Sequence, residues 1–433
     1  MNKRSFLFIF VYLLFLLPFI AVSIFLSIEK DKNALKDKGF ISIEERIEDY
    51  EYFWDFIYNG YPFTEVCERK GADLKEIRQS GYRYLTDPMM QYGYYSFYMS
   101  LCRKITNGRY MGHLYPANYY DFRSNFYTIP IYKNFIKDMP LINSFYNKLR
   151  KVSELNTQKK IFISSLTNRF PMLVNNTNNK LKVNKKVIEE SKIAYIKIHS
   201  FYMDSNFERN EYIKFVDEFF IETYNYKHII IDIRNNGGGS ERNYECLITP
   251  NLEKNISFFY YYLYNENKYT NIWIKDLFKE YPKTKEKIEK SEIPNVKNCG
   301  TVKNDKAIKL KNVLASKPIF GHKPRTGKKF WLLVNGGSYS AADRFADVCK
   351  RTGFAKLVGE RTGGAGTNGI YPVYIVLPNS GLLIKFDFMY GLIEDGYCTD
   401  ETGTAPDIYN LPGKSALGTC LETIKNLGER TNF

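Results

Sequence analysis

Histidine and cysteine are scarce in this sequence, and the cysteines form no motif. Four histidines and seven cysteines occur among 433 residues, and no two cysteines stand in a C-x-x-C arrangement. Cysteine-based metal and redox centres leave such spacings in a sequence, so we expect no metal site and no cofactor. The cysteine number is odd and Cys349 lies on the packed face of an expected helix, so we predict mostly free, buried thiols. If the chain lies outside the cell, one disulfide among these cysteines is compatible with the sequence.

Signatures of nucleic-acid binding are also missing. The formal net charge is +15, from 62 lysines and arginines against 47 acidic residues. No helix-turn-helix, zinc-finger or RNP pattern accompanies this charge, so we expect no nucleic-acid partner. A chain tethered beside an anionic membrane or envelope would account for the positive charge without a specific ligand.

One long stretch, from Phe6 to Leu26, has no charged residue. Its length suits a helix that crosses a bilayer. We therefore predict a transmembrane anchor or a signal segment over residues 1–28, followed by a charged linker over residues 29–40. Ala21-Val22-Ser23 is compatible with cleavage by a signal peptidase. Basic residues flank the segment on both sides, so the sequence does not decide its orientation in the membrane. The membrane, reached through this segment, is an expected partner.

The rest of the chain is too long for one average domain. It divides into a helical part, residues 41–160, and an α/β part, residues 161–433. In the helical part, apolar residues recur at spacings of three and four. The helices expected there cover residues 43–57, 73–85, 94–105 and 122–160.

Strand patterns dominate the α/β part. The first three expected strands cover residues 160–166, 180–188 and 192–201. A long later interval predicts a strand at 257–269, a helix at 273–281, and a loop or lid at 283–305 that either covers a site or is a solvated insertion. The last expected elements are a hairpin of residues 370–377 and 381–392 and a closing helix at 416–427.

An expected strand and an expected helix meet at Ser340. The apolar run Phe330–Val334 ends at Asn335-Gly336-Gly337, which is typical of a buried strand followed by a tight turn. A helix is expected from Ala341 onward, because apolar residues recur at Ala342, Phe345, Ala346 and Cys349. Ser340 could be only an N-cap. It could also be a nucleophile, because the free N–H groups and the dipole at a helix start stabilise an anion beside its hydroxyl.

A second glycine turn follows another expected strand. The run Ile229–Ile233 leads into Asn235, Asn236 and three consecutive glycines, Gly237–Gly239. Glycine costs backbone entropy and is useful where the main chain must approach something closely or adopt a positive φ. Two such turns in one domain could place backbone N–H groups from both on one oxyanion.

Three blocks of the sequence together resemble a known family. They are DIRNNGGG (232–239), VNGGSYSAADRFA (334–346) and LVGERTGGAG (357–366), and weaker similarity extends from about Asp49 to TAPDI (404–408). They resemble the carboxyl-terminal processing (tail-specific) peptidases and the tricorn core protease. The resemblance implies a serine peptidase on a ClpP/crotonase-like α/β core of strand-strand-helix units. It also implies peptide or protein substrates and an extracytoplasmic catalytic domain.

The resemblance places Ser340, rather than Ser338, on the nucleophile position. It places the backbone amides of Gly237 or Gly238 and of Ala341 on the oxyanion-hole positions.

The lysine base used by one branch of this family is missing. The matching position is Ala365. Lys356 is near in sequence but lies in an expected strand, and Arg361 keeps its proton at any working pH. The base must therefore come from elsewhere, and a neutral imidazole is the usual partner of a serine hydroxyl near neutral pH.

His113 is the candidate base among the four histidines. It follows a helical stretch, and Gly108 and Gly112 loosen the backbone around it. It matches the position of a histidine in the tricorn-like branch of the family, which lacks the lysine. We expect His228 and His199 to be structural and His322 to lie in a solvated basic turn.

A carboxylate usually holds such an imidazole in the right tautomer. The resemblance favours Asp400 for this role, with Glu401 one position off, and either residue could instead belong to an exposed acidic turn. In tricorn-like members a serine beside the histidine links it to the acid, whereas Gly112 stands there in this chain.

Together these features predict a membrane-anchored serine endopeptidase with Ser340 as nucleophile and His113 as general base. The alternative is a catalytically inactive family member that binds peptides or another ligand at the membrane, suggested by the missing lysine and serine. No PDZ glycine loop is evident between His113 and Lys192, so we expect no PDZ domain to grip a substrate's C-terminus.

Overall fold

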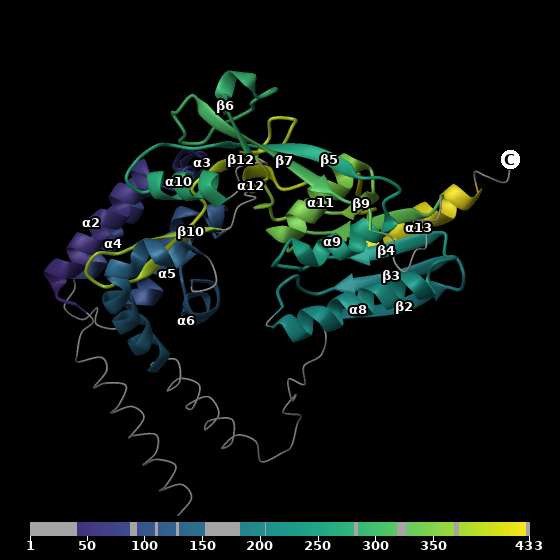
Figure 1. Ribbon diagram of the computed structural model, residues 1–433, viewed down its shortest axis with the longest axis horizontal. Helices are drawn as coiled ribbons and strands as arrows, with labels where there is room; N and C mark the ends of the chain where they lie inside the picture. Colours follow the sequence, from purple (N-terminus) through teal and green to yellow (C-terminus); the bar gives the residue numbers. More distant parts are fainter. Residues whose placement is uncertain are drawn as a thin grey trace, which may run out of the picture.

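The computed structural model describes residues 41–86, 93–108, 111–126, 130–151, 182–203, 205–280, 285–317, 327–367 and 372–429. A helical region lies at one end of the molecule and a large sheet flanked by helices at the other (Figure 1). This mixed α/β architecture agrees with the prediction. The expected membrane segment and linker, the strand at 160–166 and His322 lie outside the described residues. Within the described ranges no helix is long and apolar enough to span a membrane.

The helical region is built on aromatic packing. α2 begins at a capping box between Ser42 and Glu45 and buries Phe53, Trp54 and Phe56 completely. Each buried ring removes on the order of 150–250 Å² from water, so this face holds the region together. Three predicted helices are present as α2 (Ile43–Asn59), α4 (Leu74–Thr86) and α5 (Tyr94–Ile105). The described part of the helix expected at 122–160 is divided into η2 (Phe122–Phe126), η3 (Pro130–Asp138) and a helix over residues 139–151. The sequence did not predict α3 (Thr64–Arg69), η1 (Met111–His113) and α6 (Tyr119–Asp121).

A six-stranded sheet forms the centre of the α/β part, in the order β13-β9-β8-β4-β3-β2. Neighbouring strands are parallel except β2, which pairs antiparallel with β3 at one edge. Because β4 and β8 are parallel neighbours, with Asp232 opposite Leu333, the turns that follow them meet at one edge of the sheet. The strands are β2 (Val183–Glu189), β3 (Ile193–Ile198), β4 (His228–Asp232), β8 (Lys329–Val334), β9 (Ala355–Gly359) and β13 (Ile408–Tyr409).

Helices cover both faces of this sheet, so its strands are apolar on both sides. Ile229 and Ile231 join the main hydrophobic core, whereas Ile230 joins a smaller cluster under the last helix. The helices of the main-core side are α8 (Asn206–Glu222), α9 (Arg242–Ile248) and α11 (Ala341–Thr352), and the opposite face carries α13 (Ala416–Glu429). α11 and α13 correspond to the two helices predicted after Ser340 and at the end of the chain.

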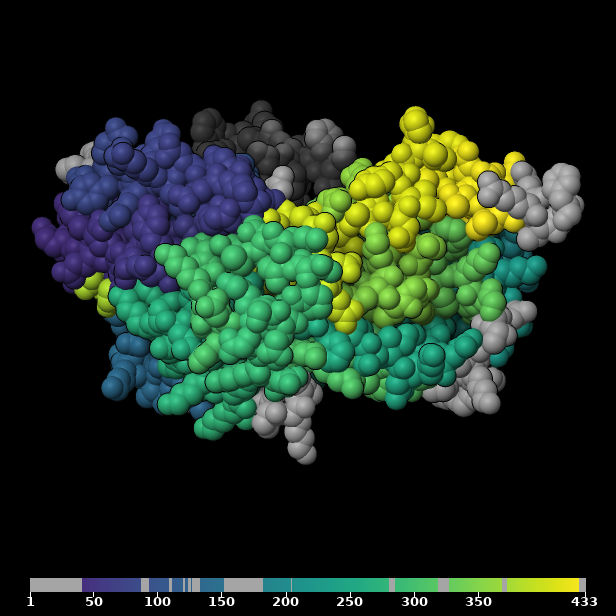
Figure 2. All heavy atoms as spheres, turned by 90° about the horizontal axis from the view of Figure 1, so that it is seen from above, coloured from purple at the N-terminus to yellow at the C-terminus, as the bar shows by residue number. Residues whose placement is uncertain are grey.

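A four-stranded antiparallel sheet, in the order β12-β5-β7-β6, lies above both parts (Figures 1 and 2). Its loops hold the helical region, since Thr301 N donates to Pro62 O at 2.8 Å and Asn267 Nδ2 donates to Asn59 O at 2.7 Å. Its elements are β5 (Ile256–Leu263), η4 (Thr249–Asn251) before it, α10 (Asn271–Glu280), β6 (Lys285–Glu289), η5 (Lys290–Glu292), β7 (Lys306–Leu314) and β12 (Tyr390–Leu392).

The loop predicted for residues 283–305 is partly wrong, because β6 lies within it and pairs with β7. β6 is mostly charged and has Ile288 as its buried apolar residue. A charged sequence is common for an edge strand, which has solvent along one side. Such a strand lacks the apolar alternation that reveals strands in a sequence.

The predicted C-terminal hairpin is present as β10 (Val373–Val376) and β11 (Leu383–Phe386). β11 also pairs with β1 (Tyr115–Pro116), which begins two residues after His113. The rings of Phe56 and Phe386 pack with centroids 4.5 Å apart. The helical region and the C-terminal hairpin therefore share one core, and this shared core brings His113 to the α/β part.

Asp49 offers a test of that shared core. Its buried carboxylate accepts from Asn379 N at 2.7 Å, from Ser380 N at 3.0 Å and from the Tyr94 hydroxyl at 2.8 Å. Asp49→Ala leaves these donors without their acceptor, and we expect the free energy of unfolding in urea to fall by about 3 kcal/mol or more. An exposed acid elsewhere in the helical region is the control: Glu68→Ala should cost about 0.5 kcal/mol or less. Equal losses would contradict this role.

Candidate active site

Ser340 stands between β8 and α11 with a strained backbone. Its φ is 57° and its ψ is −120°, a region that costs a non-glycine residue about 1–3 kcal/mol and is found mainly at functional sites. Its side chain makes no capping hydrogen bond to α11. The hydroxyl points instead toward the helical region, so the Ser340 side chain does not cap α11.

The Ser340 hydroxyl meets the imidazole of His113. The distance from Ser340 Oγ to His113 Nε2 is 3.2 Å, which is within hydrogen-bonding reach. On the other side of the ring, His113 Nδ1 lies 2.7 Å from Asp387 Oδ2. His113 and Asp387 are both buried, and Ser340 is half-buried. The three side chains form a chain from carboxylate to imidazole to hydroxyl.

The loop that carries His113 is held at several backbone atoms. Tyr61 donates its hydroxyl to Met111 O. Asp387 N donates to Gly112 O at 2.7 Å, and Gly112 N donates to Asp400 Oδ1 at 3.2 Å. These bonds keep His113 at a φ of 50°, an uncommon conformation for a residue with a side chain.

Gly112 has no room for the serine that tricorn-like members carry beside their histidine. A Cβ at this position would lie 2.5 Å from a ring carbon of Phe63. In this chain Asp387 reaches the imidazole directly, so no linking serine is needed between them.

The acid at His113 therefore differs from the expected one. Asp400 bonds the backbone of Gly112, while Glu401 directs its carboxylate to Arg69 and Asn298. Both ring nitrogens of His113 are engaged by other residues. Sequence reasoning missed Asp387, although a signal was available: it stands between Phe386 and Phe388 and is the only acid of residues 381–392.

The two glycine turns are tied together beside Ser340. Asn235 N donates to Asn335 Oδ1 and Asn335 Nδ2 donates to Asn235 Oδ1, both at 2.9 Å. Gly238 has a φ of 99°, and a Cβ on it would lie 2.9 Å from the Ser340 Cβ. The triple-glycine turn therefore packs directly against the serine, and no side chain fits between them.

The backbone amides at this junction are not equivalent. Gly238 N donates to Asn236 Oδ1 at 2.9 Å. Gly237 N and Ala341 N, in contrast, have no acceptor among the described residues. Both are candidates to bind an oxyanion, one from each turn, whereas the Gly238 amide is already engaged.

Ser338, the other serine of this turn, is structural. It is fully buried, and its hydroxyl donates to Ile233 O at 2.8 Å. It also accepts from Asn335 N at 3.2 Å. These bonds join the turn after β8 to the turn after β4.

The loop after β9 supplies no lysine to Ser340. Ala365 is buried at the position where the related branch has its base, with a φ of 67°. Lys356 lies exposed on β9, and Arg361 donates to Gly403 O. The loop is anchored by the buried Asp343, which accepts from Gly366 N at 2.8 Å; burial raises the pKa of that carboxyl.

No other described group competes for the role of base. Burial and the neighbouring carboxylates raise the pKa of Tyr339 well above its usual value, so this phenol next to His113 stays protonated. His228 Nδ1 accepts from Trp331 Nε1 at 3.2 Å, and burial lowers the pKa of this histidine. His199 contacts Asn184 on β2.

Neither a metal-binding cluster nor a reactive thiol is found among the described residues. Across the described ranges, no group of three or more His, Cys, Asp or Glu side chains is arranged to hold a metal ion. The seven cysteines are free thiols, as predicted for most of them. Burial raises the pKa of Cys67 and Cys246 to about 12, so neither is a thiolate at neutral pH.

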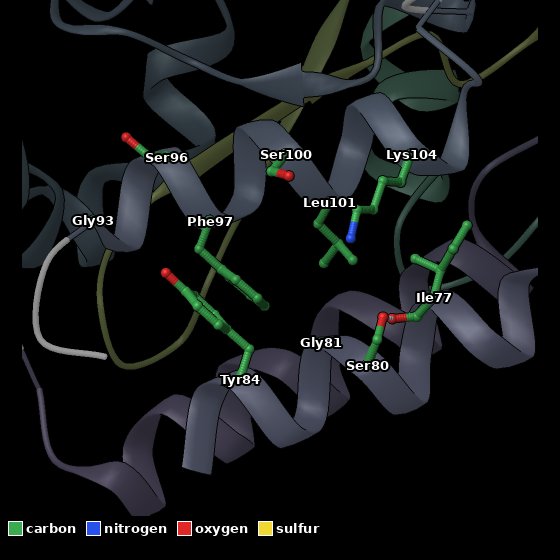
Figure 3. A pocket seen from close by; sticks show the side chains of 10 residues that line it. All are labelled: Ile77, Ser80, Gly81, Tyr84, Gly93, Ser96, Phe97, Ser100, Leu101 and Lys104. Carbon is green, nitrogen blue, oxygen red and sulfur yellow. Dashed lines mark hydrogen bonds between the residues drawn. The ribbon is translucent and has the colours of Figure 1, made fainter. Parts of the chain in front are cut away.

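A hollow of about 370 Å³ lies between α4 and α5, apart from this site (Figure 3). Its walls include the stacked rings of Tyr84 and Phe97 and the side chain of Lys104. Ser340, His113 and Asp387 do not line it.

Comparison with known proteins gives a family match. A family model described as peptidase family S41 matches residues 192–410, which is just over half of the chain. The matched range includes Ser340, both glycine turns and Asp387, but His113 lies before it. No curated protein sequence matches the chain.

Several solved structures match the chain. A candidate peptidase from Parabacteroides merdae has 17% identity and a TM-score of 0.50, covering 87% of this chain and 96% of its own. A lipoprotein from Streptococcus agalactiae has 14% identity and a TM-score of 0.44, covering 88% and 96%. The photosystem II D1 C-terminal processing protease has 16% identity and a TM-score of 0.32, covering 53% and 45%.

Gly238 provides a test of the junction between the two turns. Gly238→Ala would place its Cβ 2.7 Å from Tyr339 O and strain a positive φ, so we expect Ser340 to be displaced. Labelling by a fluorophosphonate probe should fall by about 100-fold or more. Gly336→Ala is the matched control, because nothing lies within 4 Å of its added Cβ. Equal labelling of the two variants would show that the close approach is unimportant.

Proposed function

Because the chain belongs to peptidase family S41, we propose that it is a serine endopeptidase in which Ser340 is the nucleophile and His113 the general base. Membership of the family makes it a serine-type peptidase, and therefore a hydrolase acting on peptides or proteins. The observation that carries the more detailed assignment is the contact chain from Asp387 through His113 to Ser340.

The proposed reaction begins with proton transfer. His113 Nε2 takes the proton of the Ser340 hydroxyl as Oγ attacks the scissile carbonyl carbon. The carbonyl oxygen becomes an oxyanion, which accepts from Gly237 N and Ala341 N. When the C–N bond breaks, His113 gives the proton to the leaving amine and an acyl-enzyme remains. Water, deprotonated by the same imidazole, then releases the acid and restores Ser340.

Asp387 is the proposed orienting acid. At 2.7 Å from His113 Nδ1, its carboxylate accepts the Nδ1–H and leaves Nε2 as the acceptor that faces Ser340. It also stabilises the imidazolium that forms when His113 takes the proton. Because His113 is buried, little water is present to weaken this interaction.

Membrane anchoring through residues 1–28, with the catalytic part outside the cytoplasm, remains part of the proposal. The uncharged stretch from Phe6 to Leu26 and the basic charge of +15 support it.

The alternative is a catalytically inactive family member that binds peptides. The missing lysine at Ala365 and the glycine at position 112 favour it. The formed Ser340–His113 contact favours the enzyme. The two differ in the reactivity of the serine hydroxyl, since binding a peptide does not require an activated nucleophile.

A fluorophosphonate probe, together with cleavage of an unstructured protein such as casein, tests the choice. We expect wild-type protein to be labelled at Ser340 and to cleave. Ser340→Ala and His113→Ala should each lower kcat by about 10⁴-fold or more, because nucleophile and base act as a unit. His199→Ala, which removes an exposed histidine on another strand end, should leave labelling unchanged.

The outcomes separate the hypotheses. If folded wild-type protein is neither labelled nor active, the inactive binding protein is supported. If His113→Ala is labelled as fast as wild type, His113 is not the base. Circular dichroism of each variant shows whether it is folded.

A further inference from the structure

We propose that α12 (Thr399–Thr402) is a bracket that sets the distance between His113 and Ser340, with Asp400 as its positioning residue. This inference rests on the proposed function, because it concerns the same two reacting groups. Asp400 acts on the backbone of the loop that carries the base, not on the imidazole ring.

One side of the bracket holds the histidine loop. The buried Asp400 accepts from Gly112 N at 3.2 Å through Oδ1, across 288 residues of sequence. Gly112 and His113 both have positive φ, at 55° and 50°. A residue with a side chain resists this conformation, so the bond opposes relaxation of His113 away from Ser340.

The other side of the bracket supports the serine. Gly364 packs against α12 so closely that a Cβ on it would lie 2.5 Å from Thr399 O. Gly364 O in turn accepts from Ser340 N at 2.8 Å. One short helix thus touches the Gly112 amide directly and reaches the Ser340 amide through a single intervening residue.

The residue after Asp400 fixes α12 to its surroundings. Glu401 accepts from Arg69 Nη2 at 2.9 Å and from Asn298 Nδ2 at 2.6 Å. The Tyr390 hydroxyl also donates to Glu401, and Lys70 donates to its backbone oxygen. These partners come from the end of α3, from β12 of the four-stranded sheet and from the loop before β7. Contacts outside the two loops that α12 positions therefore hold α12 in place.

The chemistry of this contact differs from that of Asp387. An amide N–H needs only an oxygen acceptor, and asparagine offers one through its own Oδ1. A forming imidazolium needs a negative charge, which asparagine lacks. Substituting each aspartate by asparagine therefore distinguishes a residue that holds a backbone amide from an acid that orients the imidazole.

The experiment compares Asp400→Asn, Asp400→Ala and Asp387→Asn by steady-state cleavage of a fluorogenic casein substrate. We expect Asp400→Asn to keep kcat within about fivefold of wild type, because the asparagine oxygen still accepts from Gly112 N, only more weakly than a carboxylate does. Asp400→Ala should lower kcat roughly 10- to 100-fold with KM nearly unchanged, since no substrate contact is lost. Asp387→Asn should lower kcat by about 10³-fold or more.

Hydrogen exchange of the Gly112 amide gives a readout that does not depend on activity. Asp400→Ala should speed this exchange by about tenfold or more, whereas Asp400→Asn and Asp387→Asn should largely preserve the bond from Gly112 N. If Asp400→Asn loses as much kcat as Asp387→Asn, Asp400 acts on the reacting groups and the inference is overturned. Unchanged exchange and unchanged kcat in Asp400→Ala would overturn it as well.

Failure of the proposed function looks different. If the wild-type chain has no activity, or Ser340→Ala retains it, the serine–histidine assignment fails. Hydrogen exchange of the Gly112 amide in the Asp400 variants then still shows whether Asp400 holds this amide.

Discussion

The contact between Ser340 and His113 depends on how the helical region is held against the α/β part. The two residues lie 227 positions apart, and His113 lies in η1, outside the six strands that the described residues form in the large sheet. Its position is set by the pairing of β1 with β11, by the packing of Phe56 on Phe386, and by the loops of the four-stranded sheet. The reacting pair therefore exists only when two differently built regions share one core.

Backbone strain shows where that shared core acts. Ser340 and His113 both have positive φ, at 57° and 50°. Each would relax to an ordinary conformation if its neighbours allowed it. Around Ser340 the neighbours are the tied asparagine turns, and around His113 they are Tyr61, Asp387 and Asp400. Burial of aromatic rings in the helical region offsets this local cost.

The acid of the site illustrates how a family pattern can point to the right segment and the wrong atom. Asp400 lies against the loop of His113, as the resemblance suggested, but it bonds an amide. Asp387 takes the ring nitrogen, because it leaves β11 directly beside β1. Which of two nearby carboxylates reaches a ring depends on a few ångströms of backbone path. Motif spacing does not contain that information.

Much of the fold was accessible from local pattern. Helices α2, α4 and α5, the strand and helix around Ser340, and the hairpin of β10 and β11 follow from apolar spacing and turn residues, which act over a few residues. The charged edge strand β6 was missed, because its stability comes from pairing with β7 and not from its own composition.

The sequence by itself determined the strand-turn-helix at Ser340, the triple-glycine turn, and the absence of a lysine at position 365, since each is a property of contiguous residues. Its resemblance to a family added His113 as a candidate. Only the tertiary structure decided that Asp387 meets the imidazole, that Asp400 holds the Gly112 amide, and that Ser338 is locked inside the turn. These choices depend on distances between segments hundreds of residues apart, which are fixed by packing of the whole core.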